Sequence, residues 1–149
     1  AGLERPQPGE VLWTLVGDPD EQRIVGDIAL LGGESFVQQH NVHRMPDGRM
    51  ALLDNRSLVV EMSRLLWLSI DEDAGTAKVS EAWTLPSHCP FQGGAWTTSN
   101  GLALATCAPR QQGYAFAPGV EMPVWSMQAT CAGSGGQRFV PRMVPLDAF

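Results

Sequence analysis

Apolar and polar positions divide this chain into short segments with the length and pattern typical of β-strands. The plainest example is a pair of strand-like segments, 36–45 and 49–53, on either side of Pro46-Asp47-Gly48. Glycine adopts positive φ without steric cost, so an Asp-Gly pair between two apolar runs is a strong signal for a tight hairpin. The sequence therefore predicts two antiparallel strands joined by a turn at this point.

Further short strands are predicted on both sides of this hairpin. Each is rich in β-branched, aromatic or other apolar side chains, and turn residues lie between them. The 16 glycines and 11 prolines favour many turns and few long helices. We expect these strands at 11–16, 63–70, 78–85, 113–116, 120–127 and 139–144, with weaker candidates at 23–28 and 58–62.

The hairpin pattern recurs further along the chain. Segment 94–106 aligns with segment 41–53 at an offset of 53 residues (94 − 41 = 53). A tryptophan recurs as well, because Trp83 and Trp125 each stand in the last predicted strand of a unit. Units of four short strands, repeated about every 45 residues, are typical of β-propellers.

The predicted fold is therefore all-β, an incomplete β-propeller built from four-stranded antiparallel blades; an all-β sandwich is the alternative. A propeller needs about four blades to close, and open sheet edges are prone to pair with other chains. We expect the chain to be part of a longer protein, or to assemble with another chain or with itself. Within the single unit 1–149, we place blades at 36–85 and 91–127, a strand of a preceding blade at 11–16 and a trailing strand at 139–144.

Composition and charge narrow the functional classes. Hydrophobic residues make up 44% and charged residues 17%, which is typical of a folded globular domain. The net charge of −6 argues against a surface for nucleic acid or an anionic membrane. No apolar run of about 18 residues is present, so we predict no membrane span. The chain opens on Ala1, and we expect it to be a processed or trimmed product that has lost any signal segment.

Three cysteines leave two interpretations open. Cys89, Cys107 and Cys131 have spacings unlike those of zinc sites, so they form either one disulfide with a free thiol or three buried thiols. The first interpretation is slightly favoured, and the pairing of Cys89 with Cys107 is the more local one.

Histidines are the main candidates for chemistry. His40 and His43 lie three positions apart on one predicted strand, and alternation should send their side chains to opposite faces. We therefore predict no shared metal ion, and hydrogen-bonded structural histidines are the plain interpretation. A metal hydrolase that also uses His88 is a weaker alternative.

Other polar residues have a structural interpretation beside a functional one. Asn55 stands in an Asp-Asn-Arg segment typical of a turn. Arg64 begins a predicted strand; it is either solvated or paired with a carboxylate, or it binds an anion such as sulfate through its guanidinium. His88 lies in a predicted loop and is either exposed or functional.

Three polar pairs follow one another along the first predicted blade. They are Gln39-His40, Asp54-Asn55 and Ser63-Arg64. In this order, together with segments 46–53 and 75–83, they resemble the bacterial arylsulfate sulfotransferases, PAPS-independent enzymes with a six-bladed β-propeller. The resemblance covers most of residues 9–127 and makes the chain similar to the C-terminal part of that propeller.

The resemblance implies a reaction and its nucleophile. In that family the histidine of the Gln-His pair attacks an aryl sulfate, is transiently sulfurylated and passes the sulfuryl group to a phenol, without a cofactor. This histidine falls on His40. We expect Asn55, Arg64 and His88 to contact substrate. The resemblance also implies a periplasmic or extracellular location.

The family's other sulfate-binding groups, a second histidine and an arginine, come from earlier blades. Activity is therefore expected only where a longer protein or a partner chain supplies those blades. Arg56 also stands where the family usually has glycine, which changes the loop over the site. The alternative function is a non-catalytic binding or structural module that keeps the family signature.

Overall fold

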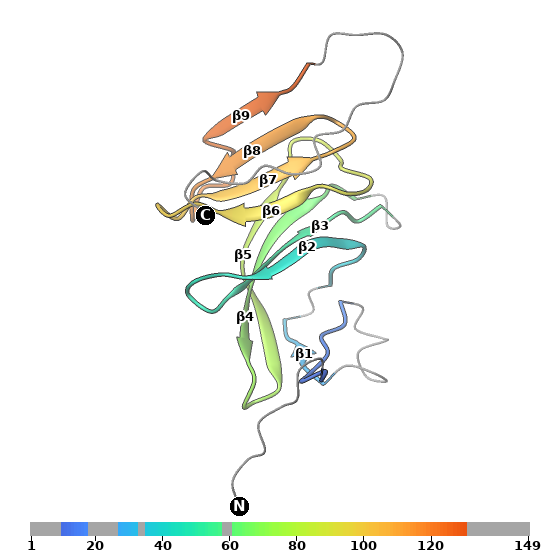
Figure 1. The fold of residues 1–149 in the computed structure, drawn as a ribbon, viewed down its shortest axis with the longest axis vertical. Helices are drawn as coiled ribbons and strands as arrows, with labels where there is room; N and C mark the ends of the chain where they lie inside the picture. Colours follow the sequence, from blue (N-terminus) through green and yellow to red (C-terminus); the bar gives the residue numbers. More distant parts are fainter. Residues whose placement is uncertain (1–9, 18–26, 33–34, 58–60, 131–149) are drawn as a thin grey trace, which may run out of the picture.

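The structure is a computed structural model that describes residues 10–17, 27–32, 35–57 and 61–130. Within these residues it contains nine strands and no helix, and so no helix that could cross a membrane (Figure 1). The strands are β1 (Ala29–Leu30), β2 (Gln39–Arg44), β3 (Met50–Asp54), β4 (Arg64–Asp71), β5 (Thr76–Thr84), β6 (Gly94–Thr97), β7 (Ala103–Cys107), β8 (Gln112–Phe116) and β9 (Trp125–Gln128).

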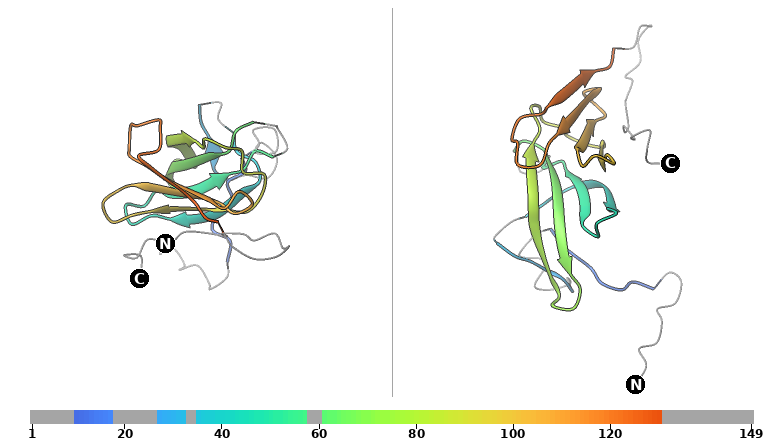
Figure 2. Two further views of the ribbon diagram at one scale, coloured as in Figure 1. Left: turned by 90° about the horizontal axis from the view of Figure 1, so that it is seen from above. Right: turned by 90° about the vertical axis from the view of Figure 1, so that its left-hand side faces the viewer.

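The strands form two successive sheets, of which the second is wholly antiparallel and the first is antiparallel except for β1. The first has the order β1-β5-β4-β3-β2 and the second the order β6-β7-β8-β9. Strands adjacent in sequence are neighbours in each sheet, and only β1 joins in parallel, on the outer edge of β5. Figure 2 shows that the second sheet covers one end of the first, while the β4–β5 hairpin runs on beyond it. The predicted all-β, incomplete propeller-like fold is confirmed.

Both predicted hairpin turns have the same backbone geometry. Gly48 has φ +89° and Gly101 has φ +83°, the conformation for which glycine is favoured. In each turn the glycine N–H donates to the carbonyl three residues earlier, that of Met45 or Thr98, at 2.9 Å. The Asp-Gly and Asn-Gly signals in the sequence therefore end their strands as predicted.

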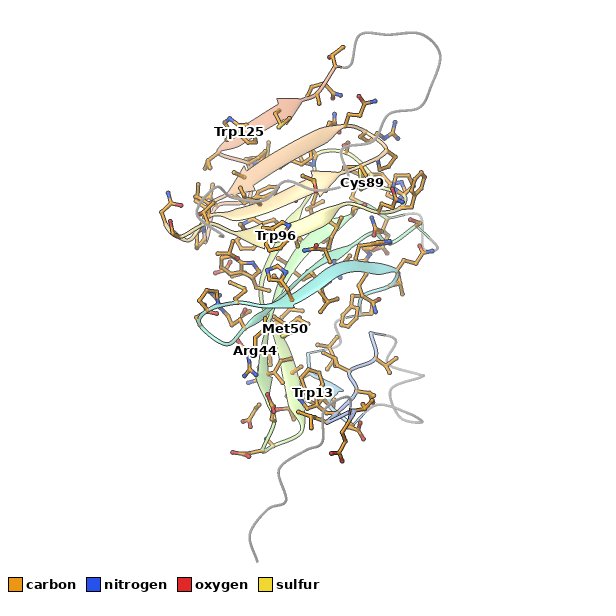
Figure 3. The ribbon with its side chains drawn as sticks, in the orientation of Figure 1. Trp13, Arg44, Met50, Cys89, Trp96 and Trp125 are labelled. Atoms are coloured by element: carbon orange, nitrogen blue, oxygen red, sulfur yellow. A yellow bond between two sulfur atoms is a disulfide. The ribbon has the colours of Figure 1, made fainter. Side chains whose placement is uncertain are left out.

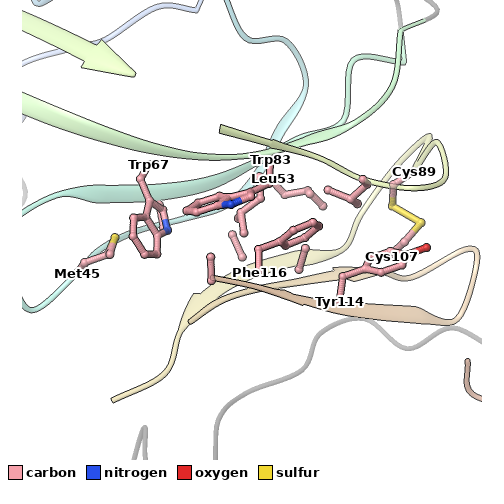
Figure 4. Close-up of a cluster of buried hydrophobic side chains, with 14 residues drawn as sticks. Met45, Leu53, Trp67, Trp83, Cys89, Cys107, Tyr114 and Phe116 are labelled. Atoms are coloured by element: carbon pink, nitrogen blue, oxygen red, sulfur yellow. A yellow bond between two sulfur atoms is a disulfide. The ribbon is translucent and has the colours of Figure 1, made fainter. Parts of the chain in front are cut away.

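The main hydrophobic core lies between the two sheets. Its aromatic centre is Trp67, which meets Trp83 edge to face with ring centroids 4.9 Å apart. Trp83 in turn stacks on Phe116, with ring centroids 6.1 Å apart (Figure 4). Alternate side chains of β3 and β4, such as Leu53 and Leu65, point into this core. Their neighbours point to the other face of the first sheet, where they pack around Phe36. The core thus holds the faces of β3 and β6 against each other.

The first predicted strand is wrong in its extent. Within 11–16 only Leu15 makes a bridge, a parallel one to Ile28. Val11 and Leu12 are 74% and 64% exposed. A β-rich run becomes a strand only where another strand accepts its hydrogen bonds, and no described strand pairs with these residues.

Other predicted strands differ less from the structure. The strand expected at 120–127 is the shorter β9, which begins at Trp125 and ends the second sheet (Figure 3). Trp125 is 48% exposed on this outer strand, unlike the buried Trp83 that aligns with it. Segments 23–26, 58–60 and 139–144 lie outside the described residues.

The favoured disulfide is present. Cys89 and Cys107 are bonded, with their Cα atoms 5.4 Å apart. The bond ties the loop that follows β5 to the end of β7, so it links the two sheets. Cys131 lies outside the described residues.

Candidate functional site

The ring of His40 is held by its Nδ1 atom at the start of β2. Nδ1 lies 2.6 Å from Oδ1 of Asn55 and 3.2 Å from the backbone carbonyl of Gln38. Both neighbours are hydrogen-bond acceptors, so Nδ1 must carry a proton and donate it. The imidazole is half-buried, and its Nε2 makes no hydrogen bond with any described residue. In the neutral ring, Nε2 therefore carries the lone pair.

Asn55 is itself fixed in one orientation. Its Nδ2 donates to the carbonyls of Cys89 at 2.8 Å and Gln92 at 3.0 Å. A flipped amide would place Oδ1 against these two acceptors, so Oδ1 must face His40. Asn55 is completely buried and both of its N–H groups are used. The side chain of Asn55 therefore orients the ring of His40. Its expected contact with substrate stays a prediction.

Ser63 connects the same residues through its hydroxyl. It accepts from the Cys89 N–H at 2.8 Å and lies 2.9 Å from the carbonyl oxygen of Asn55. Gly93 gives the loop the space to pack here, because a Cβ on it would lie 2.3 Å from the Thr106 carbonyl oxygen. Its φ of +106° also disfavours any other residue. The loop that holds Asn55 through the carbonyls of Cys89 and Gln92 therefore packs closely against β7 at Gly93.

His40 and His43 point to the same face of β2, so the prediction of opposite faces is wrong. His40 pairs with Leu53 and His43 pairs with Ala51 across the antiparallel ladder. The four residues 40–43 of β2 therefore span the three residues 51–53 of β3, which is a β-bulge. Leu53 and Ala51 share one face, and directly opposed residues point the same way. The bulge thus turns both histidines toward the second sheet.

Asn41 is the bulged residue, and it was not singled out from the sequence. Its φ is +53°, and its Nδ2 donates to the Ala95 carbonyl of β6 at 2.6 Å. Asparagine is one of the few side chains that tolerate this conformation. An asparagine inside an otherwise alternating strand was the available signal.

Arg64 lies on the opposite face of the first sheet. It pairs with Asp54, whose carboxylate it contacts through Nε at 3.1 Å and Nη2 at 2.8 Å. Nη2 also donates to the Ser35 carbonyl at 2.6 Å. Asp54 is fully buried and also accepts from the Val37 N–H. Of the two interpretations of Arg64, pairing with a carboxylate describes the structure, and Arg64 does not meet His40.

His88 stands one residue before Cys89 in the loop that holds Asn55. Its Nε2 is buried and has no hydrogen-bond partner among the described residues. Its carbonyl accepts from Nε of Arg110 at 3.3 Å. Among the described residues, the His88 ring makes no hydrogen bond with His40. In the described part of the chain, no three His, Cys, Asp or Glu side chains cluster as metal ligands would.

The three polar pairs of the sequence therefore form two separate networks. His40, Asn55 and Ser63 meet on the side of the second sheet, and Asp54 and Arg64 meet on the other side. Comparison with protein-family models, with curated proteins and with solved structures finds no match to this chain.

Proposed function

We propose that His40 is the nucleophile of a sulfuryl transfer from an aryl sulfate to a phenol. The observation that supports this most directly is the hydrogen bond between Nδ1 and Asn55, which leaves the lone pair on Nε2. An imidazole held in one tautomer by a buried amide is prepared for nucleophilic attack without reorganisation. The order of the three polar pairs along the chain supports the substrate class.

In the first half-reaction, Nε2 attacks the sulfur atom of the aryl sulfate. The N–S bond forms while the bond between sulfur and the aryl oxygen breaks, and the phenolate leaves with the electron pair. The ring becomes positively charged, with a proton on Nδ1 and the sulfuryl group on Nε2. Oδ1 of Asn55 accepts from Nδ1 throughout, so it stabilises the charge that develops on the ring.

In the second half-reaction, the oxygen of an acceptor phenol attacks the same sulfur atom. The N–S bond breaks, its electron pair returns to Nε2, and the phenol proton passes to water. Because Arg64 is occupied by Asp54 on the other face, the cations that hold the sulfate oxygens come from outside the described residues. Further blades, in a longer protein or in a partner chain, are the proposed source.

Covalent labelling tests the proposal. The natural gene product is incubated with 4-nitrophenyl sulfate, and its intact mass is measured before and after an acceptor phenol is added. We expect one added sulfuryl group, which peptide fragmentation places on His40, and its loss when phenol is added. His40→Ala should abolish the adduct, and Asn55→Ala should slow its formation by about 10- to 100-fold because the tautomer is no longer fixed.

Two outcomes would contradict the nucleophile assignment: a folded protein that forms no adduct, or an adduct that persists in His40→Ala. The first outcome would favour the alternative, a non-catalytic propeller-type module. Circular dichroism of each variant shows whether the fold is retained.

A further inference from the structure

A cavity of about 660 Å³ lies at the other end of β2, between the turns of the two equivalent hairpins. Its lining begins at His43 and continues into the β2–β3 turn, and on the opposite side it includes Trp96 and the residues after β6. Figure 3 shows Trp96 at the junction of the two sheets. The volume is in the range of small-molecule sites. His40 and Asn55 do not line it.

Flat rings form the walls of this cavity. His43 stacks on Trp96 with ring centroids 4.9 Å apart, and Trp67 contributes a second indole. The guanidinium of Arg49 lies 4.3 Å from the centre of the Trp67 ring. Walls of this kind favour a planar aromatic ligand, because ring faces stack over a large area.

Several polar atoms of the lining can donate hydrogen bonds. Nε1 of Trp67 and Oγ1 of Thr97 are buried and have no partner among the described residues. Arg49 binds Asp47 through Nε at 2.8 Å and Nη2 at 2.6 Å, and no described residue bonds its Nη1. Buried donors without acceptors are unusual in a folded protein. An acceptor group on a ligand would satisfy them.

The guanidinium groups of the lining supply directed contacts for an anion. Arg44 and Arg49 stand against the single carboxylate of Asp47, although Arg44 also lies 3.5 Å from Glu72 outside the cavity. With Glu72 counted, two guanidinium groups face two carboxylates, so the surroundings of the cavity are neutral while the whole chain has a net charge of −6. An anion is drawn to such a site only by local contacts, which arginine supplies with directed N–H groups.

We propose that this cavity binds a planar aromatic anion, with the ring against the wall formed by His43 and Trp96 and the anionic group toward Arg49 and Thr97. The site is separate from His40, so the proposal does not depend on sulfuryl transfer.

Calorimetric titration with 2-naphthoate and with neutral 2-naphthamide tests both parts of this proposal. The chain should bind one naphthoate, and naphthamide about tenfold more weakly. Arg49→Gln should weaken naphthoate binding about tenfold and leave naphthamide binding unchanged. Trp96→Leu should weaken the binding of both by at least about tenfold, because stacking is lost.

Matched controls separate the cavity from the rest of the surface. Trp125→Leu and Arg110→Gln change a tryptophan and an arginine outside the cavity and should leave naphthoate binding unchanged. His40→Ala should also leave it unchanged, even if it abolishes sulfuryl transfer. Thr97→Val, which keeps the side-chain shape, should weaken naphthoate binding a few-fold, so the test stands even if Trp96→Leu disturbs the fold.

Several results would overturn the proposal. One is the absence of saturable naphthoate binding at millimolar concentration. Another is equal affinity for naphthoate and naphthamide. A third is binding that falls in His40→Ala or in the control variants as much as in Arg49→Gln.

Discussion

The β2–β3 and β6–β7 hairpins are two versions of one unit, and their difference locates the candidate site. They align at an offset of 53 residues and have the same turn, with Gly48 and Gly101 in the same conformation. Even their contact follows the repeat, because His43 stacks on its own equivalent, Trp96 (43 + 53 = 96).

The two hairpins differ at the start of their first strands. The ladder between β6 and β7 is regular from Gly94 to Thr97, whereas β2 contains the bulge at Asn41. Leu53 therefore faces His40, while its equivalent, Thr106 (53 + 53 = 106), faces Gly94. A single extra residue thus places an imidazole where the other hairpin has no side chain.

The ends of the second strands are also held differently. Asp54 forms the buried ion pair with Arg64, while its equivalent, Cys107 (54 + 53 = 107), forms the disulfide with Cys89. The comparison shows that the turn and the core pattern define the unit, while the bulge and the strand-end contact are free to change. Three predictions test these differences, from the largest effect to the smallest.

Removal of the Arg64 side chain should have the largest effect. Arg64→Ala leaves the buried carboxylate of Asp54 without its cation, and we expect the free energy of unfolding to fall by about 3–5 kcal/mol. Urea unfolding measures this loss. The double variant Asp54→Leu/Arg64→Met removes both charges and should recover most of the stability. A loss below about 1 kcal/mol would show instead that the pair behaves like an exposed ion pair.

Substitutions of Asn41 test the bulge. Asn41→Gly keeps the positive φ and loses the bond to the Ala95 carbonyl and the longer contact of 3.4 Å with Nδ1 of His43, so we expect a loss of about 1 kcal/mol. Asn41→Val adds the strain of a β-branched side chain in this conformation, with a total of about 2–3 kcal/mol. Thermal unfolding of both variants gives the difference. Equal losses would mean that the bulge does not depend on the positive φ of Asn41.

The third prediction concerns Asp47 in the β2–β3 turn. Its equivalent in the β6–β7 turn is Asn100. The hydrogen bond from the Arg49 side chain holds the pKa of the Asp47 carboxyl below its ordinary value. The lowered pKa stabilises the fold above the ordinary aspartate pKa of about 4. This stability is lost as pH falls through the folded-state pKa, because the proton binds the unfolded chain more tightly.

The size of this effect is small, since the Asp47 side chain is 48% exposed. We expect Asp47→Asn to lower the free energy of unfolding by a few tenths of a kcal/mol near neutral pH and by less in acid. Asn100→Asp should give no matching gain in the free energy of unfolding, because the equivalent of Arg49 in this turn is Leu102. A difference between Asp47→Asn and the wild type that stays constant from about pH 6 to about pH 3 would argue against the ion pair.

Much of the fold could be predicted because its signals are local. Asp47-Gly48 and Asn100-Gly101 specify their turns through backbone conformations that few residues adopt. Alternation along β3 and β4 places Leu53 and Trp67 in the core, and the repeat relates the two sheets. A disulfide was only slightly favoured from the sequence, and the bond between Cys89 and Cys107 is the more local of the pairings that were left open.

The candidate site could be predicted only in part. His40 and Asn55 were named from the sequence, but their contact spans 15 residues, and the carbonyl groups that fix Asn55 lie 34 and 37 residues away from it. Arg64 was named as well, yet register sends it with Asp54 to the opposite face. The facing of the two histidines was predicted wrongly, because strict alternation fails wherever a strand contains a bulge.

The sequence by itself determined the strands, the turns, the repeat and the residues available for chemistry, because these depend on side chains a few positions apart. Only the tertiary structure decided which of those residues meet. Partners for His40, Asn55 and Arg64 depend on register, on the bulge at Asn41 and on a loop from beyond the first sheet, and all three arise from packing between distant segments.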